Sequence, residues 1–360
     1  MNIFNVGAWR PATGKLRAAR LSAASDLVER TLSAHGLQTH AHPQPQPPQQ
    51  TMSSLLAALT PMHAPSAAPT GPLPSGAAFR SEQFSSKVGS RSYRVYVPST
   101  VAQGVTGVVV MLHGCTQTPE DFAIGTSMNT LAEKHGFVVV YPHQSRGDNA
   151  QSCWNWFSRG DQRRDRGEPA ILAGLTRDVM AEFDVPPQRT FAAGLSAGAA
   201  MAVILGQTYP DIFAAIGAHS GLPFGAAKDV PSAFAAMAGN ALNSPAPLPH
   251  SNAVRTIVFH GTTDSVVHPS NGDRIQQDAL HRTMGQTIET KEENTVSNRR
   301  VIRSIASHPD GITAVEHWHI EGLGHAWSGG DAKGSYTDAS GPDASAEMIR
   351  FFFESDTKDL

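Results

Sequence analysis

The sequence is poor in charge, in clustered basic residues and in long apolar runs. Only 16% of its 360 residues are charged and the formal net charge is −3. Nucleic acids and anionic membranes are bound by clusters of Lys and Arg, but the dense stretch GDQRRDRGE at 160–168 alternates in sign. No stretch offers the roughly 18 consecutive apolar residues of a membrane-spanning helix. We therefore expect no nucleic-acid partner and no membrane span.

The sequence also lacks a secretory signal and has few cysteines, and these two features bear on where the protein is located and on whether it binds a metal. The opening residues MNIFNVGAWRPATGKLR lack the apolar run of a secretory signal, so we expect a cytoplasmic protein. The chain has only two cysteines, Cys115 and Cys153, without a Cys-x-x-Cys motif or a histidine pair to complete a four-ligand zinc site. We expect neither a metal nor a cofactor.

The first 76 residues differ in composition from the rest. AHPQPQPPQQ at 41–50 and APSAAPTGPLPSG at 64–76 are rich in Pro, Gln, Ser and Ala, which favours extended, solvated chain. Apolar residues at helical spacing predict a peripheral helix at 16–37. The composition thus predicts an N-terminal arm at 1–76 and a single catalytic domain at 77–360.

The catalytic domain has the pattern of alternating strands and helices. Continuous apolar runs such as GVVVMLHG are typical of strands buried on both faces of a parallel sheet. Strands are predicted at 91–97, 107–114, 136–142, 189–195, 213–220 and 254–261, and helices at 122–135 and 169–184. This alternation predicts an α/β fold with a mostly parallel central sheet and helices on both faces.

A candidate nucleophile follows the strand at 189–195. The residues Gly194-Leu195-Ser196-Ala197-Gly198 stand between that strand and an apolar helix, the context of a G-x-S-x-G nucleophile elbow. Side chains at 194 or 198 would collide with the neighbouring strand and helix. A plain Gly/Ser turn is the alternative, and the flanking elements favour the elbow.

A catalytic serine needs a histidine base and an acid that orients it, in the chain order Ser, Asp, His. Asp264 follows the strand at 254–261, and His325 lies in a glycine-rich loop after the strand HWHI. We therefore predict Ser196, Asp264 and His325 as the catalytic triad. The other candidates for base or acid rank lower; they are His260, His268, His317, His319, Asp331 and Asp338.

Two backbone N–H groups are predicted to stabilise the charge that develops on the substrate carbonyl oxygen. The elbow itself supplies the N–H of Ala197. The loop LHGCTQ at 112–117 supplies the second, from Cys115 or a neighbour.

The order of five motifs resembles one family. LHGCTQTPEDFA, SCWNWF, GLSAGAAM, HGTTDSVV and GLGHAWSGG together resemble the polyhydroxybutyrate depolymerase and esterase group of α/β hydrolases, whose relatives include feruloyl and acetylxylan esterases. The resemblance runs from about residue 92 to residue 353. It implies the same triad, an oxyanion hole at Cys115 and Ala197, and a cysteine pair near the site. Because no secretory signal and no C-terminal polymer-binding module are evident, the chain looks more like the intracellular depolymerases.

The resemblance also bears on the cysteines and on substrate binding. It implies a Cys115–Cys153 disulfide between two loops near the site; two free thiols, which a cytosolic location favours, are the alternative. Trp154 and Trp327 adjoin the site in sequence, and we expect them to line a substrate groove unless they belong to the core. The Ala-, Met- and Phe-containing segment 224–251 is predicted to be a mobile cover.

The function expected from these features is carboxylic ester hydrolysis. The expected substrate is polyhydroxybutyrate or its oligomers, with the polymer granule as a further partner. A feruloyl or acetylxylan esterase is the first alternative. The second is a non-catalytic protein of the same fold that binds granules, although such a binder has no need of three separated triad residues in order.

Overall fold

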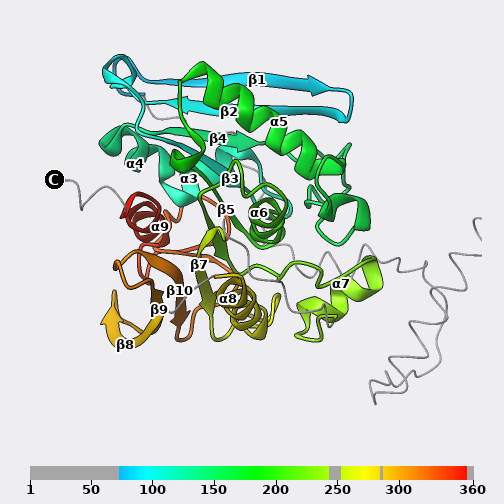
Figure 1. Ribbon diagram of the computed structural model, residues 1–360, viewed down its shortest axis with the longest axis vertical. Coiled ribbons are helices and arrows are strands. Elements are labelled where there is room, and N and C mark those ends of the chain that lie inside the picture. Colours follow the sequence, from blue (N-terminus) through cyan, green and yellow to red (C-terminus); the bar gives the residue numbers. More distant parts are fainter. Residues whose placement is uncertain (1–72, 243–252, 284–286, 355–360) are drawn as a thin grey trace, which may run out of the picture. The chain divides into compact units, whose positions relative to one another are not determined.

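A ten-stranded sheet forms the centre of the domain (Figure 1). The computed structural model describes residues 73–242, 253–283 and 287–354. The strands lie side by side in the order β1-β2-β4-β3-β5-β6-β7-β10-β9-β8. Their bounds are β1 Ala78–Ser86, β2 Gly89–Val97, β3 Val108–Leu112, β4 Val138–Pro142, β5 Thr190–Leu195, β6 Ala215–His219, β7 Arg255–Gly261, β8 Ile288–Val296, β9 Arg299–Ser307 and β10 Thr313–Ile320.

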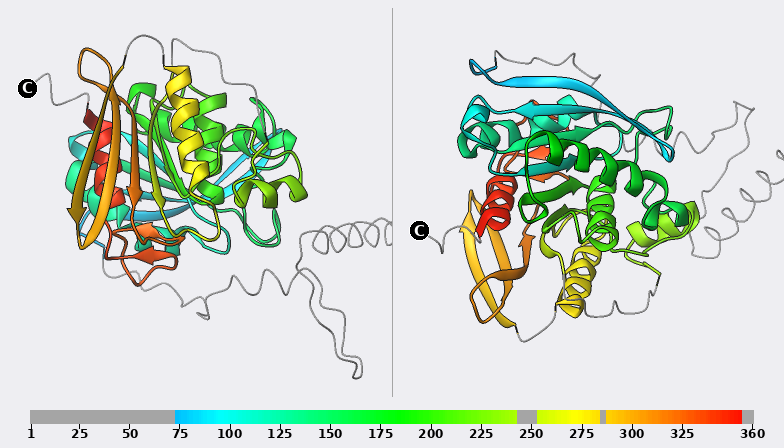
Figure 2. Two further views of the ribbon diagram at one scale, coloured as in Figure 1. Left: turned by 90° about the horizontal axis from the view of Figure 1, so that it is seen from below. Right: turned by 45° about the horizontal axis from the view of Figure 1, so that its top comes forward.

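The six central strands, from β4 to β10 in that order, are parallel. Every residue of β3, β4, β5 and β6 is buried, which explains their continuous apolar sequences. Antiparallel pairs complete the sheet, with β1 and β2 at one edge and β9 and β8 at the opposite edge (Figure 2). A short parallel pair, β11 Trp327–Ser328 and β12 Thr337–Asp338, lies outside the main sheet.

Helices cover both faces of the sheet and enclose two apolar cores (Figure 1). On one face α5, α6 and α8 pack against the strands; on the other face lie α3, α4 and α9. The helix bounds are α3 Pro119–Thr126, α4 Met128–His135, α5 Gly167–Glu182, α6 Ala197–Thr208, α7 Val230–Met237, α8 Ser270–Arg282 and α9 Ala344–Phe353. The predicted mostly parallel sheet with helices on both faces is confirmed.

Most predicted elements occur where the sequence placed them, with one correction. The single helix predicted at 122–135 is wrong, because the chain forms two helices there. Ser127 between them has φ +52°, in the left-handed region, and this conformation interrupts the helical hydrogen bonds. The helix predicted at 169–184 is confirmed as α5, which begins and ends two residues earlier.

Some predictions concern residues outside the described ranges. The helix at 16–37, the Pro-rich linkers and the last part of the 224–251 segment lie there, so they stay predictions, as does the boundary at residue 76. None of the helices within the described ranges is both long enough and apolar enough to cross a bilayer.

Candidate active site

Ser196 lies at the sharp turn between β5 and α6. Its backbone has φ +57° and ψ −119°, a conformation that costs energy in any residue with a side chain and is typical of functional sites. A Cβ on Gly198 would lie 2.0 Å from the carbonyl oxygen of Leu112, and one on Gly194 would lie 2.6 Å from the same atom. The collisions expected from the sequence are therefore present, and both glycines are required by the close approach of α6 to β3.

Asp264 and His325 come together at the carboxyl ends of β7 and β10. The Nδ1 atom of His325 lies 2.8 Å from Oδ2 of Asp264. The other carboxylate oxygen accepts hydrogen bonds from the backbone N–H groups of Val266 and Val267, at 3.0 and 2.9 Å. Both oxygens of Asp264 are thus held, and a carboxylate in this position fixes the orientation of the imidazole.

The loops that carry these two residues are bound to each other. The backbone N–H of Thr263 and its hydroxyl both donate to the carbonyl oxygen of Leu323, at 3.1 and 2.9 Å. A Cβ on Gly261 would lie 2.1 Å from that oxygen. The glycine therefore permits the contact that brings the Asp264 loop against the His325 loop.

Asp264 is charged in this environment. Burial raises the pKa of its carboxyl group, but the hydrogen bond and charge of His325 and the N–H of Val267 lower it by more, so that the pKa lies below its usual value. The aspartate is therefore ionised at neutral pH and can stabilise a protonated imidazole.

His219, at the end of β6, joins the serine turn to the histidine loop. Its carbonyl oxygen accepts a hydrogen bond from the backbone N–H of Ser196 at 2.9 Å. Its Nε2 atom accepts a hydrogen bond from the backbone N–H of Ser328 at 3.0 Å. Between the described side chains of Ser196 and His325 there is no hydrogen bond. Catalytic hydrogen bonds are often long without substrate, and His219 is the residue that connects the two loops here.

Ala197 and Cys115 are the two predicted oxyanion donors. The backbone N–H group of each has no hydrogen-bond acceptor among the described residues. Ala197 is the first residue of α6, where an N–H has no partner within the helix. The Cys115 loop is held by Gln117, whose Oε1 accepts the N–H of Gly114 at 2.9 Å and whose Nε2 donates to Asp121 at 3.0 Å. Both N–H groups can therefore bind an anionic oxygen.

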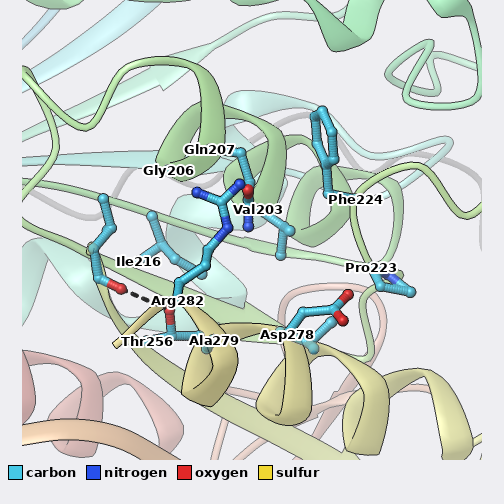
Figure 3. Close-up of a pocket in the computed structure, with 12 residues that line it drawn as sticks. Val203, Gly206, Gln207, Ile216, Pro223, Phe224, Thr256, Asp278, Ala279 and Arg282 are labelled. Carbon is cyan, nitrogen blue, oxygen red and sulfur yellow. Dashed lines mark hydrogen bonds between the residues drawn. The ribbon is translucent and has the colours of Figure 1, made fainter. Parts of the chain in front are cut away.

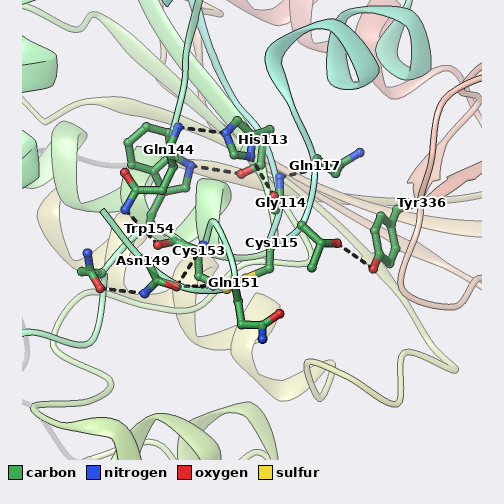
Figure 4. The surroundings of a disulfide bond; sticks show 12 residues. His113, Gly114, Cys115, Gln117, Gln144, Asn149, Gln151, Cys153, Trp154 and Tyr336 are labelled. Carbon is green, nitrogen blue, oxygen red and sulfur yellow. Dashed lines mark hydrogen bonds between the residues drawn. A yellow bond between two sulfur atoms is a disulfide. The ribbon is translucent and has the colours of Figure 1, made fainter. Parts of the chain in front are cut away.

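The predicted disulfide is confirmed. Cys115 and Cys153 are bonded, with their Cα atoms 4.3 Å apart (Figure 4). Next to the bond, the N–H of Thr116 donates to the carbonyl oxygen of Gln151 at 2.8 Å. The disulfide thus ties the oxyanion loop to the CWNWF loop.

A buried polar network lies beneath these loops. Gln144 donates from its side chain to Glu168 at 2.6 Å and from its backbone to Nε2 of His113 at 3.1 Å. Glu168 also accepts the backbone N–H of Asn155 at 2.7 Å, and Arg91 hydrogen-bonds Gln144. Sequence reasoning missed this network and His219; the one signal was the position of His219 at the carboxyl end of a buried strand.

The burial of Trp154 and Trp327 contradicts the expectation that they line a substrate groove. Trp154 is 0% exposed and Trp327 is 1% exposed. Each indole N–H has an internal partner, the carbonyl oxygen of His113 at 3.1 Å for Trp154 and the hydroxyl of Ser345 at 3.0 Å for Trp327. Both are core residues that support the catalytic loops from below.

The residues ranked lower as candidates for the base or the acid lie behind the Asp264–His325 pair or in other parts of the domain. His260 is buried with Nε2 3.6 Å from Asp264 and 2.9 Å from the carbonyl oxygen of Val267, so it lies behind the acid. His268 is exposed and contacts Ser270. His317 and His319 lie on β10 next to α8. Asp338 pairs with Arg299, and Asp331 caps a turn through Lys333.

A separate pocket lies between α6 and α8, drawn in Figure 3. Its lining includes Gln207, Phe224, Asp278 and Arg282 and contains none of the predicted triad residues. Nearer the triad, α7 packs on the loop that follows Asp264, because Met237 accepts the N–H of His268 at 2.8 Å. The mobility expected of the 224–251 segment stays a prediction.

The geometry can be compared with known proteins. A solved acetyl xylan esterase from Aspergillus awamori superposes with a TM-score of 0.57 at 21% identity, covering 73% of this chain and 93% of that one. This likeness establishes the α/β-hydrolase fold. Poly(3-hydroxyalkanoate) depolymerase C of Paucimonas lemoignei is 30% identical over 258 residues, 67% of this chain and 60% of the relative.

Acetylxylan esterases are also similar in sequence. A probable acetylxylan esterase A of Aspergillus fumigatus is 27% identical over 213 residues, 55% of this chain and 56% of that protein. The chain thus spans about 60% of the length of these curated relatives. Residues 91–297 match the family described as "Esterase PHB depolymerase". Because this match covers more than half of its length, the chain belongs to the Esterase PHB depolymerase family.

Proposed function

We propose that this protein is a serine esterase that cleaves carboxylic esters at Ser196. The observation that carries the proposal is the 2.8 Å contact between His325 and Asp264. It forms at the carboxyl ends of strands in the same parallel sheet whose β5 leads into Ser196, a serine in the strained elbow conformation. In this proposal His325 is the base, Asp264 orients it, and the N–H groups of Ala197 and Cys115 bind the oxyanion.

The reaction runs in two halves. The Nδ1–H of His325 points to Asp264, so Nε2 takes the proton of the Ser196 hydroxyl while the oxygen attacks the ester carbonyl carbon. The tetrahedral oxyanion accepts hydrogen bonds from the backbone N–H groups of Ala197 and Cys115. The bond between the carbonyl carbon and the alkoxy oxygen then breaks, and His325 gives its proton to the leaving alcohol. Water, deprotonated by the same imidazole, then attacks the acyl carbon. The bond to the Ser196 oxygen breaks, the imidazolium returns its proton to that oxygen, and the acid and the free serine are released.

For the substrate we propose polyhydroxybutyrate or its soluble oligomers. The depolymerase relative supports this class, and so does the surface of α7, which packs beside the Asp264 loop. Val230 and Phe234, one helical turn apart on α7, are 43% and 46% exposed. Exposed apolar side chains on a helix that packs on the Asp264 loop suit an apolar polyester better than a hydrated polysaccharide. Association with polymer granules belongs to this proposal.

Acetylxylan is the second candidate substrate, because curated relatives of similar identity are named acetylxylan esterases. The experiment compares initial rates on amorphous polyhydroxybutyrate, acetylated xylan and methyl ferulate at equal enzyme. We expect hydroxybutyrate release from the polymer. Ready turnover of acetylated xylan with untouched polymer would favour the second candidate, and no turnover of any ester would favour a non-catalytic granule-binding protein.

A variant separates the proposed polymer contact of α7 from the chemistry. Phe234→Ala on α7 should lower the rate on the polymer several-fold while p-nitrophenyl butyrate is turned over as in the wild type. Val88→Ala, which removes an exposed apolar side chain near the β1–β2 turn, is the matched control and should change neither rate. Equal polymer rates for all three proteins would remove the support that α7 lends to the polyester.

A further inference from the structure

Two histidines and an aspartate meet outside the catalytic site, between β10 and α8. His317 and His319 alternate along β10 and so project from the same face of the sheet. Helix α8 covers that face (Figure 1) and carries Asp273 in its first turn. One ligand atom from each of the three residues lies within 4.8 Å of the other two.

The distances are close to those of a metal site. Oδ1 of Asp273 lies 3.5 Å from Nε2 of His319 and 4.0 Å from Nδ1 of His317. Ligand atoms about 2.0–2.1 Å from a tetrahedral Zn²⁺ are separated by about 3.4 Å. The two pairs, at 3.5 and 4.0 Å, therefore need to close by about 0.1 and about 0.6 Å to reach that separation. Oε1 of Gln276, one turn further along α8, lies 3.0 Å from Nδ1 of His317 and supplies a fourth oxygen.

Two unpartnered nitrogen atoms behind the cluster fit the tautomer that metal binding requires. Nε2 of His317 and Nδ1 of His260 are buried and have no hydrogen-bond partner among the described residues. Both face Gly272, where a Cβ would lie 3.1 Å from the first nitrogen and 2.7 Å from the second. His260 donates from Nε2 to the carbonyl oxygen of Val267 at 2.9 Å, so its Nδ1 bears a lone pair.

A cation on Nδ1 of His317 gives these atoms a consistent arrangement. The proton of His317 then lies on Nε2, near the same glycine as the unprotonated Nδ1 of His260, and no hydrogen bond joins the two rings. With the proton on Nδ1 instead, that N–H donates to Oε1 of Gln276 at 3.0 Å, and two unprotonated nitrogen atoms are left near Gly272. A metal ion on Nδ1 moves the proton to Nε2 and leaves only one unprotonated nitrogen there.

The cluster is also accessible. The side chains of Asp273 and His319 are 47% and 27% exposed, whereas His317 is fully buried. Lys291 on β8 acts electrostatically on His319 and opposes a cation, while Asp273 favours it. Two imidazoles with oxygen ligands select borderline cations such as Zn²⁺ over Mg²⁺ and Ca²⁺, which prefer oxygen alone.

We propose that His317, His319 and Asp273, assisted by Gln276, form a Zn²⁺-class metal site that clamps α8 to β10. This site was not expected from the sequence, because the two cysteines do not form a four-ligand zinc motif and the histidines lie elsewhere in the chain. The His-x-His pattern of a strand is the signal that points to it.

The test is titration of the metal-free full-length protein with Zn²⁺ by calorimetry, with thermal unfolding as a second readout. We expect one equivalent of tight binding and a raised Tm in the wild type. His319→Ala and Asp273→Asn should lose that equivalent and the Tm increase. His281→Ala, which removes an exposed histidine from the same helix, is the matched control and should keep both. Mg²⁺ at the same concentration should leave the Tm unchanged.

The histidines outside the site are present in the wild type, His319→Ala and Asp273→Asn, so their binding cancels when these three proteins are compared. Identical isotherms for the wild type and His319→Ala, or no Zn²⁺ bound by the wild type, would overturn the proposal. A measurement that needs no variant is electron paramagnetic resonance with one equivalent of Cu²⁺. The proposal requires hyperfine coupling to two imidazole nitrogens, and a spectrum without nitrogen coupling contradicts it.

Discussion

The Nε2 atom of His219 accepts a hydrogen bond from the backbone N–H of Ser328 at 3.0 Å. Since the carbonyl oxygen of His219 also accepts the N–H of Ser196, this buried residue connects the nucleophile turn to the loop of His325. It can do so only as neutral imidazole, because a protonated ring has no acceptor nitrogen. His113 has the same arrangement, with Nε2 accepting the N–H of Gln144 at 3.1 Å.

The two buried histidines predict acid sensitivity. Burial lowers the pKa of His219 to about 3 and that of His113 to about 4, from 6.5. Because both folded-state values are depressed, the unfolded chain binds protons first. The stability that the neutral rings provide is therefore fully present above pH 6.5. It is lost progressively as the pH falls toward about 4 for His113 and about 3 for His219.

Urea unfolding at pH 7.5, 6 and 5 measures this effect. The His219→Gln variant, whose amide oxygen replaces Nε2 as acceptor, should lose less stability between pH 7.5 and pH 5 than the wild type. His308→Gln, at a turn residue outside the site, should follow the wild type. The same slope in all three proteins would contradict the role of His219.

The elbow predicts a sharp contrast between two glycines. In Gly198→Ala the new methyl group would lie 2.0 Å from the carbonyl oxygen of Leu112, whereas Gly324→Ala, next to His325, meets no atom within 4 Å. We expect Gly198→Ala to lower the free energy of unfolding by more than about 3 kcal/mol or to prevent folding. Gly324→Ala should stay near the wild type. Thermal unfolding of the two variants in parallel decides this, and similar Tm values would contradict the close packing of α6 on β3.

The disulfide should contribute to stability. Cys115 and Cys153 are 38 residues apart, and closing a loop of this size in the unfolded chain is worth about 4 kcal/mol in the chain-entropy model. Thiol titration of the denatured, unreduced protein should find no free thiol, and reduction should lower the Tm. Two titratable thiols in freshly purified protein would contradict the bond. The cytoplasmic location expected from the sequence stays a prediction, and the redox state of the two cysteines bears on it because the cytosol keeps thiols reduced.

Asp264→Asn should impair chemistry while the fold persists. An amide at this position cannot stabilise the imidazolium and favours the wrong tautomer of His325, so we expect kcat for a small ester to fall by a factor on the order of 10⁴. Asp178→Asn, at an exposed position of α5, is the matched control. The two rates should be compared with circular dichroism spectra of both variants; a loss smaller than tenfold would argue against Asp264 as the acid.

The sequence predicted the triad positions because each follows a strand and they occur in the chain order of this fold. It could not predict the role of His219, which depends on two loops that are distant in sequence. The β8–β9 hairpin was also missed, since nearly all of β8 is exposed and has no apolar alternation to detect. The sequence shows that Trp154 is close to the candidate site along the chain, which favours a place in a substrate groove. It does not show that the side chain is buried, and so the predicted groove position is wrong.

The measurement that tests the central claim most directly is the rate of p-nitrophenyl butyrate hydrolysis by full-length Ser196→Ala. It should be compared with the wild type and with Ser90→Ala, which removes an exposed hydroxyl from β2. Because the triad acts as a unit, we predict a loss of at least about 10⁴-fold for Ser196→Ala, a wild-type rate for Ser90→Ala, and native circular dichroism spectra for both. A Ser196→Ala rate within tenfold of the wild type would contradict the assignment of Ser196 as the nucleophile.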